Sequence, residues 1–215
     1  MNNKISFIDD TGRVVVPAGL TGSSEKSIEF VDLSDPFQED LAAFEVDGTW
    51  GFFDRYGHIV IKPEYSEVLG FSEGLAAVRM LSRDLEKKKW GFIDRKGQMV
   101  IAPAYTDVRS FSAGLAAVRI TALDGDKRDS KWGFIDRSGK TVVAPAYEQA
   151  SYFSEGLAAV QIAGHGESSG RWGFIDQKGQ FIVAPSYSQV DTFSDGLAAV
   201  MLSTTEGEKP INKWG

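Results

Sequence analysis

The sequence predicts an all-β fold made of tandem antiparallel meander units of about 40 residues each. The first observation is a Trp-Gly pair that recurs at intervals of 40, 42, 40 and 42 residues. The second is the series of turn and strand signals inside each interval, and the third is the lack of any segment with helical periodicity. A fixed period of this size is typical of a stacked or circular array of one supersecondary unit. The tryptophans of the pairs are Trp50, Trp90, Trp132, Trp172 and Trp214.

The first half of a unit, read from residue 89 onward, predicts a β-hairpin. Residues 90–93 (Trp-Gly-Phe-Ile) form a short strand with bulky side chains. Residues 94–97 place Asp first and Gly fourth, as in a type I turn followed by a left-handed glycine. Residues 98–102 return as a strand rich in β-forming side chains. We expect Pro103 to end that strand, because proline cannot donate to a ladder.

The second half of the unit predicts a corner, a second turn and a further strand. Residues 104–111 place Tyr, Val and Phe three apart, which fits neither a regular strand nor a long helix, so we expect a tight corner and a short strand. Residues 112–114 (Ser-Ala-Gly) form a turn, and residues 115–120 (Leu-Ala-Ala-Val-Arg-Ile) form a strand. The polar loop 121–130 then leads to the next Trp-Gly strand.

Five units are expected, joined in a single array over residues 1–215. The first is atypical, as terminal repeats usually are: Ile5 and Ser6 stand in place of Trp and Gly, and Asp40 replaces the glycine of the second turn. A closed five-bladed propeller and an open β-solenoid both fit. We favour a propeller-like closed array, because meander units resemble blades and because the chain begins on a strand without Trp-Gly and ends on a spare Trp-Gly pair. The units span residues 4–48, 49–88, 89–130, 131–170 and 171–213.

Composition limits the classes of function. Apolar residues make up 42% of the chain and charged residues 25%, as in soluble globular proteins. No apolar run is long enough for a membrane helix, and the N-terminus has no apolar signal region, so we expect a cytoplasmic protein without membrane insertion. The absence of cysteine excludes disulfides and zinc–thiolate sites. A net charge of −7 argues against nucleic acid and is compatible with solubility alone or with a basic protein partner.

Aromatic residues that recur in every complete unit are predicted to form the repeat core. Rings lining sugar-binding grooves are the alternative, which requires that some of them be exposed. The predicted core rings are Trp50, Trp90, Trp132, Trp172, Tyr65, Tyr105, Tyr147, Tyr187, Phe71, Phe111, Phe153 and Phe193.

Candidate catalytic and metal-binding residues are few. The turn aspartates would form a carboxylate ring in a closed array, but one Asp per unit is too distant from its copies to share an ion, so we expect each to cap its own hairpin. His58 and His165 occupy non-equivalent positions. No nucleophile elbow, P-loop or dinucleotide-binding glycine motif occurs, so we predict no enzyme activity, cofactor or metal site. The turn aspartates are Asp9, Asp54, Asp94, Asp136 and Asp176.

The loops that precede each Trp differ between units, and loops are where repeat proteins usually bind. One of them holds a small basic cluster of Arg83 with Lys87, Lys88 and Lys89; a solvated loop is favoured over a phosphate site there, because acidic residues are interleaved. The loops span residues 79–89, 119–131, 161–171 and 201–213. The candidate partner-binding residues are Arg83, Asp84, Glu86, Asp124, Asp126, Glu167, Glu206 and Glu208.

The strings Lys-Trp-Gly-Phe-Ile-Asp-Arg-x-Gly, Val-Ile-x-Pro-x-Tyr and Phe-Ser-x-Gly-Leu-Ala-Ala-Val resemble the bacterial WG-repeat (KWG-repeat) family over residues 4–215. The resemblance implies a β-rich binding or structural module without a shared catalytic motif, in contexts that include toxin–immunity systems. We therefore expect a non-catalytic protein-binding module, most concretely an inhibitor or immunity-like protein that binds a bacterial toxin or effector. A carbohydrate or cell-envelope binding module and a scaffold domain of a larger protein are the alternatives.

Overall fold

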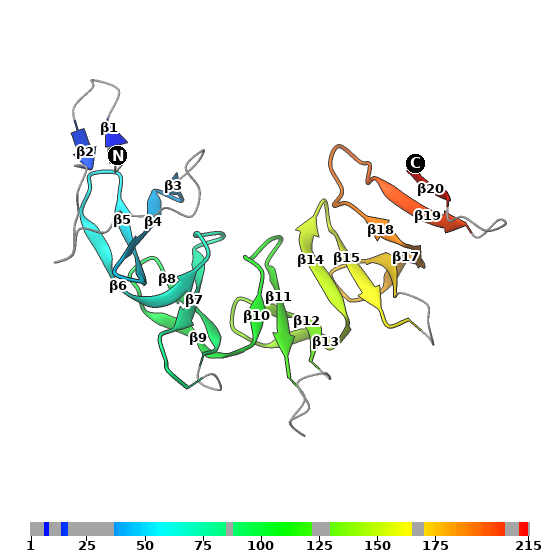
Figure 1. The fold of residues 1–215 in the computed structure, drawn as a ribbon, viewed down its shortest axis with the longest axis horizontal. Coiled ribbons are helices and arrows are strands. Elements are labelled where there is room, and N and C mark those ends of the chain that lie inside the picture. Colours follow the sequence, from blue (N-terminus) through cyan, green and yellow to red (C-terminus); the bar gives the residue numbers. More distant parts are fainter. Residues whose placement is uncertain are drawn as a thin grey trace. The chain divides into compact units, whose positions relative to one another are not determined.

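The computed structural model describes residues 37–84, 88–121, 130–164 and 170–202, and the backbone alone of residues 7–8, 14–16, 203–204 and 211–214. Within these ranges the fold is all-β, and every strand pairing is antiparallel (Figure 1). No helix in the described ranges is long and apolar enough to cross a membrane. The chain divides into two compact units, Met1–Ala104 (unit 1) and Tyr105–Gly215 (unit 2). The single array over residues 1–215 and its closure stay predictions.

Unit 1 contains a two-stranded sheet and a larger sheet in which the strands follow chain order. The small sheet pairs β1 (Phe7–Ile8) with β2 (Val14–Val16). The larger sheet has seven strands, of which the last ends at the boundary with unit 2. Its strands are β3 (Phe37–Gln38), β4 (Leu41–Val46), β5 (Thr49–Asp54), β6 (Ile59–Val68), β7 (Leu75–Met80), β8 (Trp90–Asp94) and β9 (Met99–Tyr105).

Unit 2 contains three meander sheets, again with neighbouring strands in chain order. The first sheet holds β10 (Asp107–Val108), β11 (Leu115–Ile120), β12 (Lys131–Asp136) and β13 (Thr141–Tyr147). The second holds β14 (Gln149–Ser154), β15 (Leu157–Ile162), β16 (Arg171–Ile175) and β17 (Phe181–Tyr187). The third holds β18 (Gln189–Val190), β19 (Val200–Thr204) and β20 (Ile211–Trp214).

The sheets are out of phase with the sequence repeat. The Leu-Ala-Ala-Val strand that closes one sequence unit pairs with the Trp-Gly strand that opens the next: β11 pairs with β12 from Leu115 opposite Asp136 to Ile120 opposite Lys131. β15 pairs with β16 in the same register, with Val160 opposite Gly173. Each sheet of this kind is therefore built from two neighbouring sequence repeats. Backbone hydrogen bonds between the strands link one repeat to the next.

The prediction that proline ends the return strand is wrong. β9 continues through Pro103 to Tyr105, and β13 continues through Pro145 to Tyr147. The reason is a bulge. Trp132 is opposite Tyr147 while Phe134 is opposite Val143, so one intervening residue of β12 faces three of β13. Proline is compatible with a bulge and with an edge strand because neither position requires its missing N–H.

The glycine of each of the first four Trp-Gly pairs lies at very short range from the return strand. A Cβ added to Gly133 would lie 2.6 Å from the Val143 carbonyl oxygen and 2.8 Å from the Pro145 nitrogen. Gly173 is equally confined, with the Val183 carbonyl oxygen 2.5 Å from the added Cβ. Both sets of neighbours are backbone atoms, which cannot rotate away. The glycine is thus required by the close approach of the return strand.

The second turn of each unit is a two-residue turn with two left-handed residues, the type I′ geometry of tight hairpins. Ala113 and Gly114 have φ values of 53° and 80°. Asp40, which replaces glycine in the first unit, has a φ of 67°. Asp tolerates this backbone region better than most residues, so the atypical unit keeps the turn.

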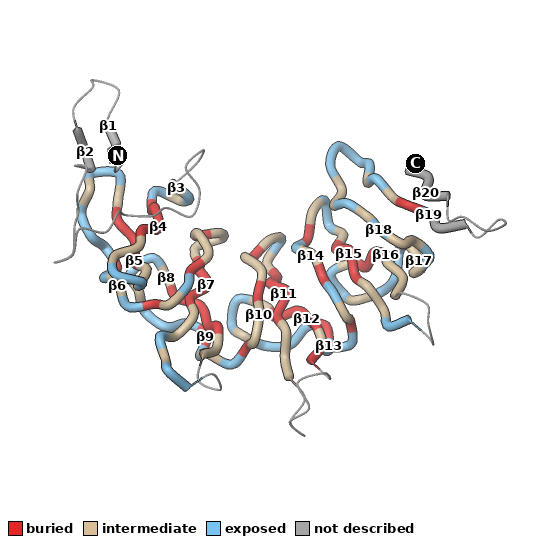
Figure 2. Tube along the Cα trace, in the orientation of Figure 1, coloured by how far each residue is buried: buried red, intermediate tan, exposed pale blue. Residues whose placement is uncertain are grey.

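Buried side chains form a core between the strands of each unit (Figure 2). The phenylalanine that follows Trp-Gly contacts the phenylalanine of the next corner, as in Phe134–Phe153 with ring centroids 5.0 Å apart. Of the predicted core rings, eight are buried and four are partly buried. The buried rings are Trp90, Trp132, Tyr65, Tyr105, Tyr147, Phe71, Phe111 and Phe153, and the partly buried rings are Trp50, Trp172, Tyr187 and Phe193.

Candidate partner-binding surface

The two ends of each sheet have different connections. β11 runs from the tight turn at residues 112–114 to the loop at 121–130, and β12 runs back from that loop to the tight turn at 136–139. The same order holds for β15 and β16 with the loop at 163–170. These two sheets, and the β7–β8 pair of unit 1, therefore have a turn end, where the connections are short, and a loop end, where the connections differ in length and sequence between repeats.

The turn end is held by aspartate side chains that bond to their own hairpins. Asp94 Oδ1 accepts hydrogen bonds from the backbone N–H groups of Lys96 (2.9 Å) and Gln98 (2.8 Å). Gly97 N–H donates to the Asp94 carbonyl at 2.9 Å with a φ of 80°, which is the predicted turn. Asp54, Asp136 and Asp176 make the same pair of side-chain contacts.

Two of these carboxyl groups have pKa values below their usual range. At Asp136 the Ser138 hydroxyl, which donates at 2.6 Å, is the main cause, with the backbone N–H groups of Lys140 and Ser138 adding to it. At Asp54 partial burial opposes the shift, but hydrogen bonds from His58 and Tyr56 outweigh burial and lower the pKa. The described residues contain no group of acidic and histidine side chains that could hold a metal ion. Asp9 and His165 lie outside the described residues.

Further contacts fix neighbouring turns of unit 2 to one another. The Ser112 hydroxyl donates to the Phe153 carbonyl oxygen at 2.6 Å, and the Ser154 hydroxyl donates to the Phe193 carbonyl oxygen at 2.7 Å. Glu155 accepts a hydrogen bond from Gly196 N–H at 2.9 Å. In unit 1, Glu39 likewise accepts from Gly74 N–H. These serine and glutamate side chains of the turn end thus hold neighbouring turns together.

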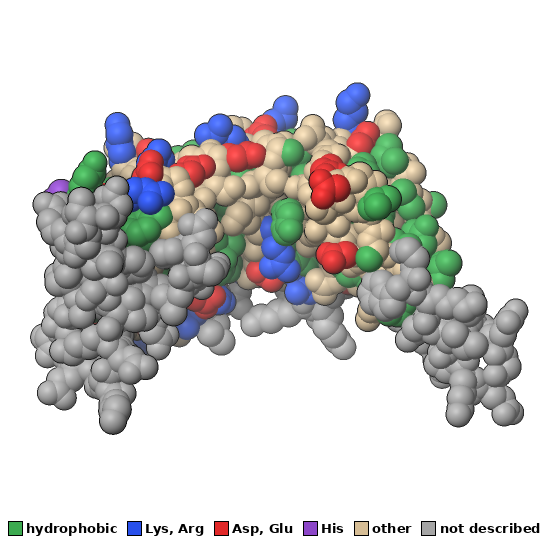
Figure 3. Space-filling view, turned by 90° about the horizontal axis from the view of Figure 1, so that it is seen from above, with side chains coloured by type: hydrophobic (Ala, Val, Ile, Leu, Met, Phe, Trp, Pro, Cys, Tyr) green, Lys and Arg blue, Asp and Glu red, His purple; other side chains and the backbone are tan. Residues whose placement is uncertain are grey.

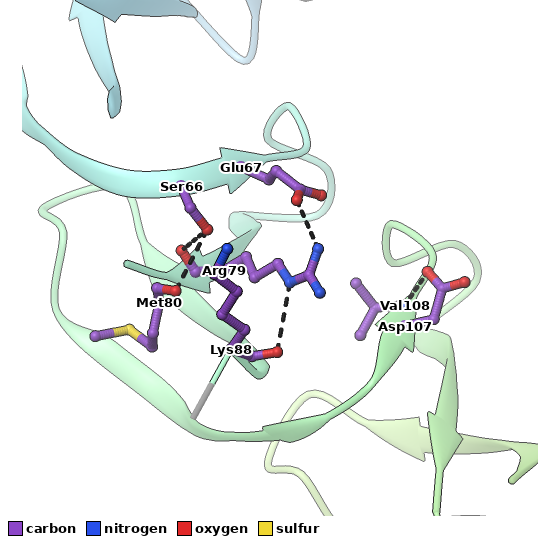
Figure 4. Close-up of polar contacts among 7 residues, drawn as sticks. All are labelled: Ser66, Glu67, Arg79, Met80, Lys88, Asp107 and Val108. Atoms are coloured by element: carbon purple, nitrogen blue, oxygen red, sulfur yellow. Dashed lines mark hydrogen bonds and ion pairs between the residues drawn. The ribbon is translucent and has the colours of Figure 1, made fainter. Parts of the chain in front are cut away.

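At the loop end of unit 1, the Arg79 side chain lies between Glu67 of β6 and Lys88, which precedes β8 (Figure 4). Its Nη1 is 2.6 Å from Glu67 Oε1, and its Nε donates to the Lys88 carbonyl oxygen at 3.4 Å. The loop that follows begins with Leu81, which is 59% exposed. Arg83 and Asp84, two of the predicted partner-binding residues, are exposed in the same loop. The other six, Glu86, Asp124, Asp126, Glu167, Glu206 and Glu208, lie outside the described residues.

At the loop end of unit 2, charged side chains lie around a tryptophan. The Arg109 guanidinium lies over the Trp132 ring, 4.8 Å from its centroid. Lys131 Nζ is 2.6 Å from Glu148 Oε1. Trp132 Nε1 and Arg119 Nε are buried without a hydrogen-bond partner among the described residues. Arg119 and Lys131 are the two ends of the predicted loop 119–131, and Trp132 was predicted as a core ring, whereas sequence reasoning did not single out Arg109 or Glu148. The structure pairs Arg119 with Trp132 across β11 and β12, and the sequence carries no local signal for this pairing.

Next to the loop end, a tryptophan on one strand is the register partner of a tyrosine on the adjacent strand. Trp50 is opposite Tyr65, and Trp132 is opposite Tyr147. Burial raises the pKa of Tyr65 to about 12, and the nearby Glu64 carboxylate contributes to the shift. Burial also raises the pKa of Tyr105 and Tyr147. These rings are therefore kept neutral and packed, and they support the loops instead of lining an open site.

Charges of both signs are interspersed on the face of the described residues drawn in Figure 3. On this face Lys and Arg side chains lie beside Asp and Glu side chains.

A family model described as WG containing repeat matches the chain four times, at residues 50–81, 90–121, 132–164 and 172–203, which together make up more than half of the sequence. The matches fall in the second to fifth predicted units. No curated protein matches the chain. A solved structure titled "Crystal structure of the eukaryotic initiation factor" is similar, with a TM-score of 0.54 and 12% identity over 91% of this chain. The match covers 54% of that chain, so this chain spans about half of its length, and at this identity the likeness concerns the fold alone.

Proposed function

Because the chain belongs to the WG-containing repeat family, we propose that it is a non-catalytic protein-binding module. The observation that carries the proposal is the contrast between the two ends of the sheets. The turn end repeats the same hydrogen bonds from one copy to the next. The loop end presents connections of different length and charge on strands of constant register. A constant frame that displays variable loops is the usual arrangement of a binding scaffold.

The chemistry of the frame supports a non-catalytic role. Its aspartates and serines accept or donate hydrogen bonds within their own or neighbouring turns. Such groups are not positioned as an acid, base or nucleophile facing a substrate. Exposed apolar side chains beside the loops, such as Leu81, supply contact surface of the kind that protein partners bury.

The most concrete form of the proposal is an inhibitor or immunity-like protein that binds a toxin or effector in the cytoplasm. Its support is the family resemblance together with the net charge of −7, which favours encounter with a basic partner. The loops provide acidic residues for such a contact, with Asp84 exposed in unit 1. Carbohydrate binding is less favoured, because every recurring ring with a described side chain is buried or partly buried.

The test is capture from lysate and secreted fractions on the immobilised chain, with the captured protein then purified and its affinity measured by calorimetry. The expected result is a stoichiometric complex with micromolar or tighter affinity, on the order of −8 kcal/mol. The matched control has residues 81–88, 121–130 and 163–170 replaced by short Gly-Ser connections, which leaves the strands intact. Capture of no partner, or equal affinity for the control, would contradict the proposal.

A further inference from the structure

Two neighbouring N–H groups lack a partner at the loop end of the first sheet of unit 2. They are the indole Nε1–H of Trp132 and the guanidinium Nε–H of Arg119, and neither donates a hydrogen bond within the part of the chain that the structure describes. Both atoms are buried, and Trp132 as a whole is only 1% exposed. A buried donor without an acceptor loses its hydration and gains nothing in return, so such a pair requires an explanation.

The two donors belong to one site because their residues are directly opposed. Arg119 of β11 is the register partner of Trp132 of β12, and side chains of opposed residues lie on the same face of a sheet, with their Cβ atoms about 5 Å apart. The Arg109 guanidinium lies over the indole ring, 4.8 Å from its centroid. Two unpaired N–H donors and two guanidinium charges therefore surround one tryptophan.

The corresponding positions in the neighbouring copies are paired within the chain. In unit 1, Arg79 Nε donates to the Lys88 carbonyl oxygen at 3.4 Å, and Arg79 Nη1 donates to Glu67 Oε1 at 2.6 Å (Figure 4). In the second sheet of unit 2, Gln161 Nε2 donates to the Gly170 carbonyl oxygen at 3.3 Å. The unpaired Arg119 donor therefore sets this sheet apart from the two copies beside it.

A shortened acidic side chain accompanies this difference. Asp107 is the register partner of Arg119, as Glu67 is the partner of the equivalent arginine in unit 1. The aspartate is one methylene shorter, and its Oδ1 accepts a hydrogen bond from Val108 N–H at 2.9 Å (Figure 4). Its carboxylate is thus engaged on its own strand. A carboxylate supplied from outside the sheet can take the place that Glu67 occupies in unit 1.

We propose that Trp132 Nε1 and Arg119 Nε form a docking site for one carboxylate of a protein partner, from an Asp or Glu side chain. A carboxylate has two accepting oxygens, so it satisfies both donors, and its charge complements the two guanidinium groups. The proposal rests on the proposed protein-binding function and names the group that one loop end recognises. A partner that is basic overall can supply this single carboxylate, so the net charge of −7 does not oppose the contact.

Entry to the site requires movement of Arg109, which lies over the ring. Its side chain is 43% exposed, and its Nη1 is 3.5 Å from the Val108 carbonyl oxygen and 3.9 Å from Asp107 Oδ1. Polar contacts at these distances are weak, so the guanidinium is free to leave the ring face and pair with the incoming carboxylate. Binding therefore exchanges a cation–π contact for a charge-assisted hydrogen bond.

The test uses acetate as the probe and the indole N–H resonance of Trp132 as the readout, in the full 215-residue chain labelled with ¹⁵N. Trp132→Phe assigns the resonance. When acetate replaces chloride at constant ionic strength, we expect a saturable shift of this resonance with a dissociation constant in the millimolar range, because the N–H gains an acceptor. The Trp90 indole resonance is the internal control and should not follow the same titration curve.

Two variants test the geometry of the site. Arg119→Lys keeps the charge but removes the Nε donor, and it should weaken acetate binding by about ten-fold or more, or about 1.4 kcal/mol. The matched control is Arg79→Lys, where the Nε already has an acceptor, and it should change the affinity by less than about two-fold. Asp107→Glu restores the longer side chain found at Glu67, and it should also weaken binding by about ten-fold. Circular dichroism of each variant establishes that the fold is kept.

Four results would overturn the proposal. They are no saturable shift at Trp132, equal weakening by Arg119→Lys and Arg79→Lys, an equal shift when nitrate replaces acetate, and a shift that appears only after residues 121–130 are replaced by a Gly-Ser connection. The third result would mean a general anion site, and the fourth would mean that an acceptor from the chain itself occupies the site. The acetate titration requires no captured partner, so it can fail while loop-dependent capture succeeds, and the reverse outcome is equally distinguishable.

Discussion

Substituting the glycine of a Trp-Gly pair is expected to destabilise the fold through a backbone clash. In Gly133→Ala, the new Cβ would lie 2.6 Å from the Val143 carbonyl oxygen, 2.8 Å from the Pro145 nitrogen and 3.0 Å from the Pro145 Cα. Ordinary contacts at such a carbon begin near 3.4 Å, so β12 and β13 must separate. Overpacking in a core costs about 1–3 kcal/mol. Since all three neighbours are backbone atoms held in a ladder, we expect about 3 kcal/mol.

The control for this substitution is Gly114→Ala, in the type I′ turn between β10 and β11 of the same sheet. Nothing lies within 4 Å of a Cβ at Gly114, but its φ of 80° is unfavourable for alanine, which costs about 1 kcal/mol. Urea unfolding followed by circular dichroism measures both variants. If Gly133→Ala lowers the free energy of unfolding no more than Gly114→Ala, the close approach of the return strand is not what requires the glycine.

Three further perturbations test the account. Burial favours the neutral form of the Tyr65 side chain in the folded state. The contribution of Tyr65 to the free energy of unfolding is therefore fully present below pH 10.0 and is lost as the pH rises toward its pKa of about 12. Wild type should lose up to about 3 kcal/mol of stability over that interval, and Tyr65→Phe should lose less in urea titrations at each pH. The lowered pKa of Asp136 gives a contribution that is present above pH 3.8 and lost below it. Asp136→Asn should therefore flatten the acid limb of melting temperature against pH. Ser154→Ala removes the 2.7 Å hydrogen bond to the Phe193 carbonyl oxygen and should lower the free energy of unfolding by about 1 kcal/mol. The control Ser138→Ala, at an exposed position, should lower it less, and the midpoint of urea unfolding measures both variants.

Much of the fold is predictable from the sequence because the repeat combines local signals with a fixed period. Asp94 and Gly97 specify their turn within four residues, and the structure confirms it. The effect of Pro103 was not predictable by the same reasoning. The rule that proline ends a strand applies to regular ladders. Here the return strand approaches Gly91 so closely that a Cβ added to Gly91 would lie 2.6 Å from the Ile101 carbonyl oxygen. This close approach depends on the pairing of two strands, which one segment of sequence does not reveal. The pairing of the last strand of one repeat with the first strand of the next was unpredictable for the same reason, because strand register depends on two segments and not on one.

The candidate surface was less predictable than the frame. The sequence identifies loops by their variation, which locates Arg83 and Asp84 on the exposed surface. It gives no local sign of Arg109 stacked on Trp132, because their contact joins residues from separate strands. It also gives no sign that Leu197 differs from Leu115. Both occupy the same motif, yet Leu197 is 76% exposed and Leu115 is 7% exposed.

The central claim is that the frame carries the fold and the loops carry binding. The most direct measurement is the dissociation constant of the captured partner, determined by calorimetry for wild type, for the variant with shortened loops and for Ser138→Ala on the turn end. The account predicts that the shortened loops weaken the complex by about a hundred-fold or more, close to 3 kcal/mol, while Ser138→Ala leaves it unchanged. An unchanged affinity after loop replacement, with the fold intact by circular dichroism, would contradict the claim.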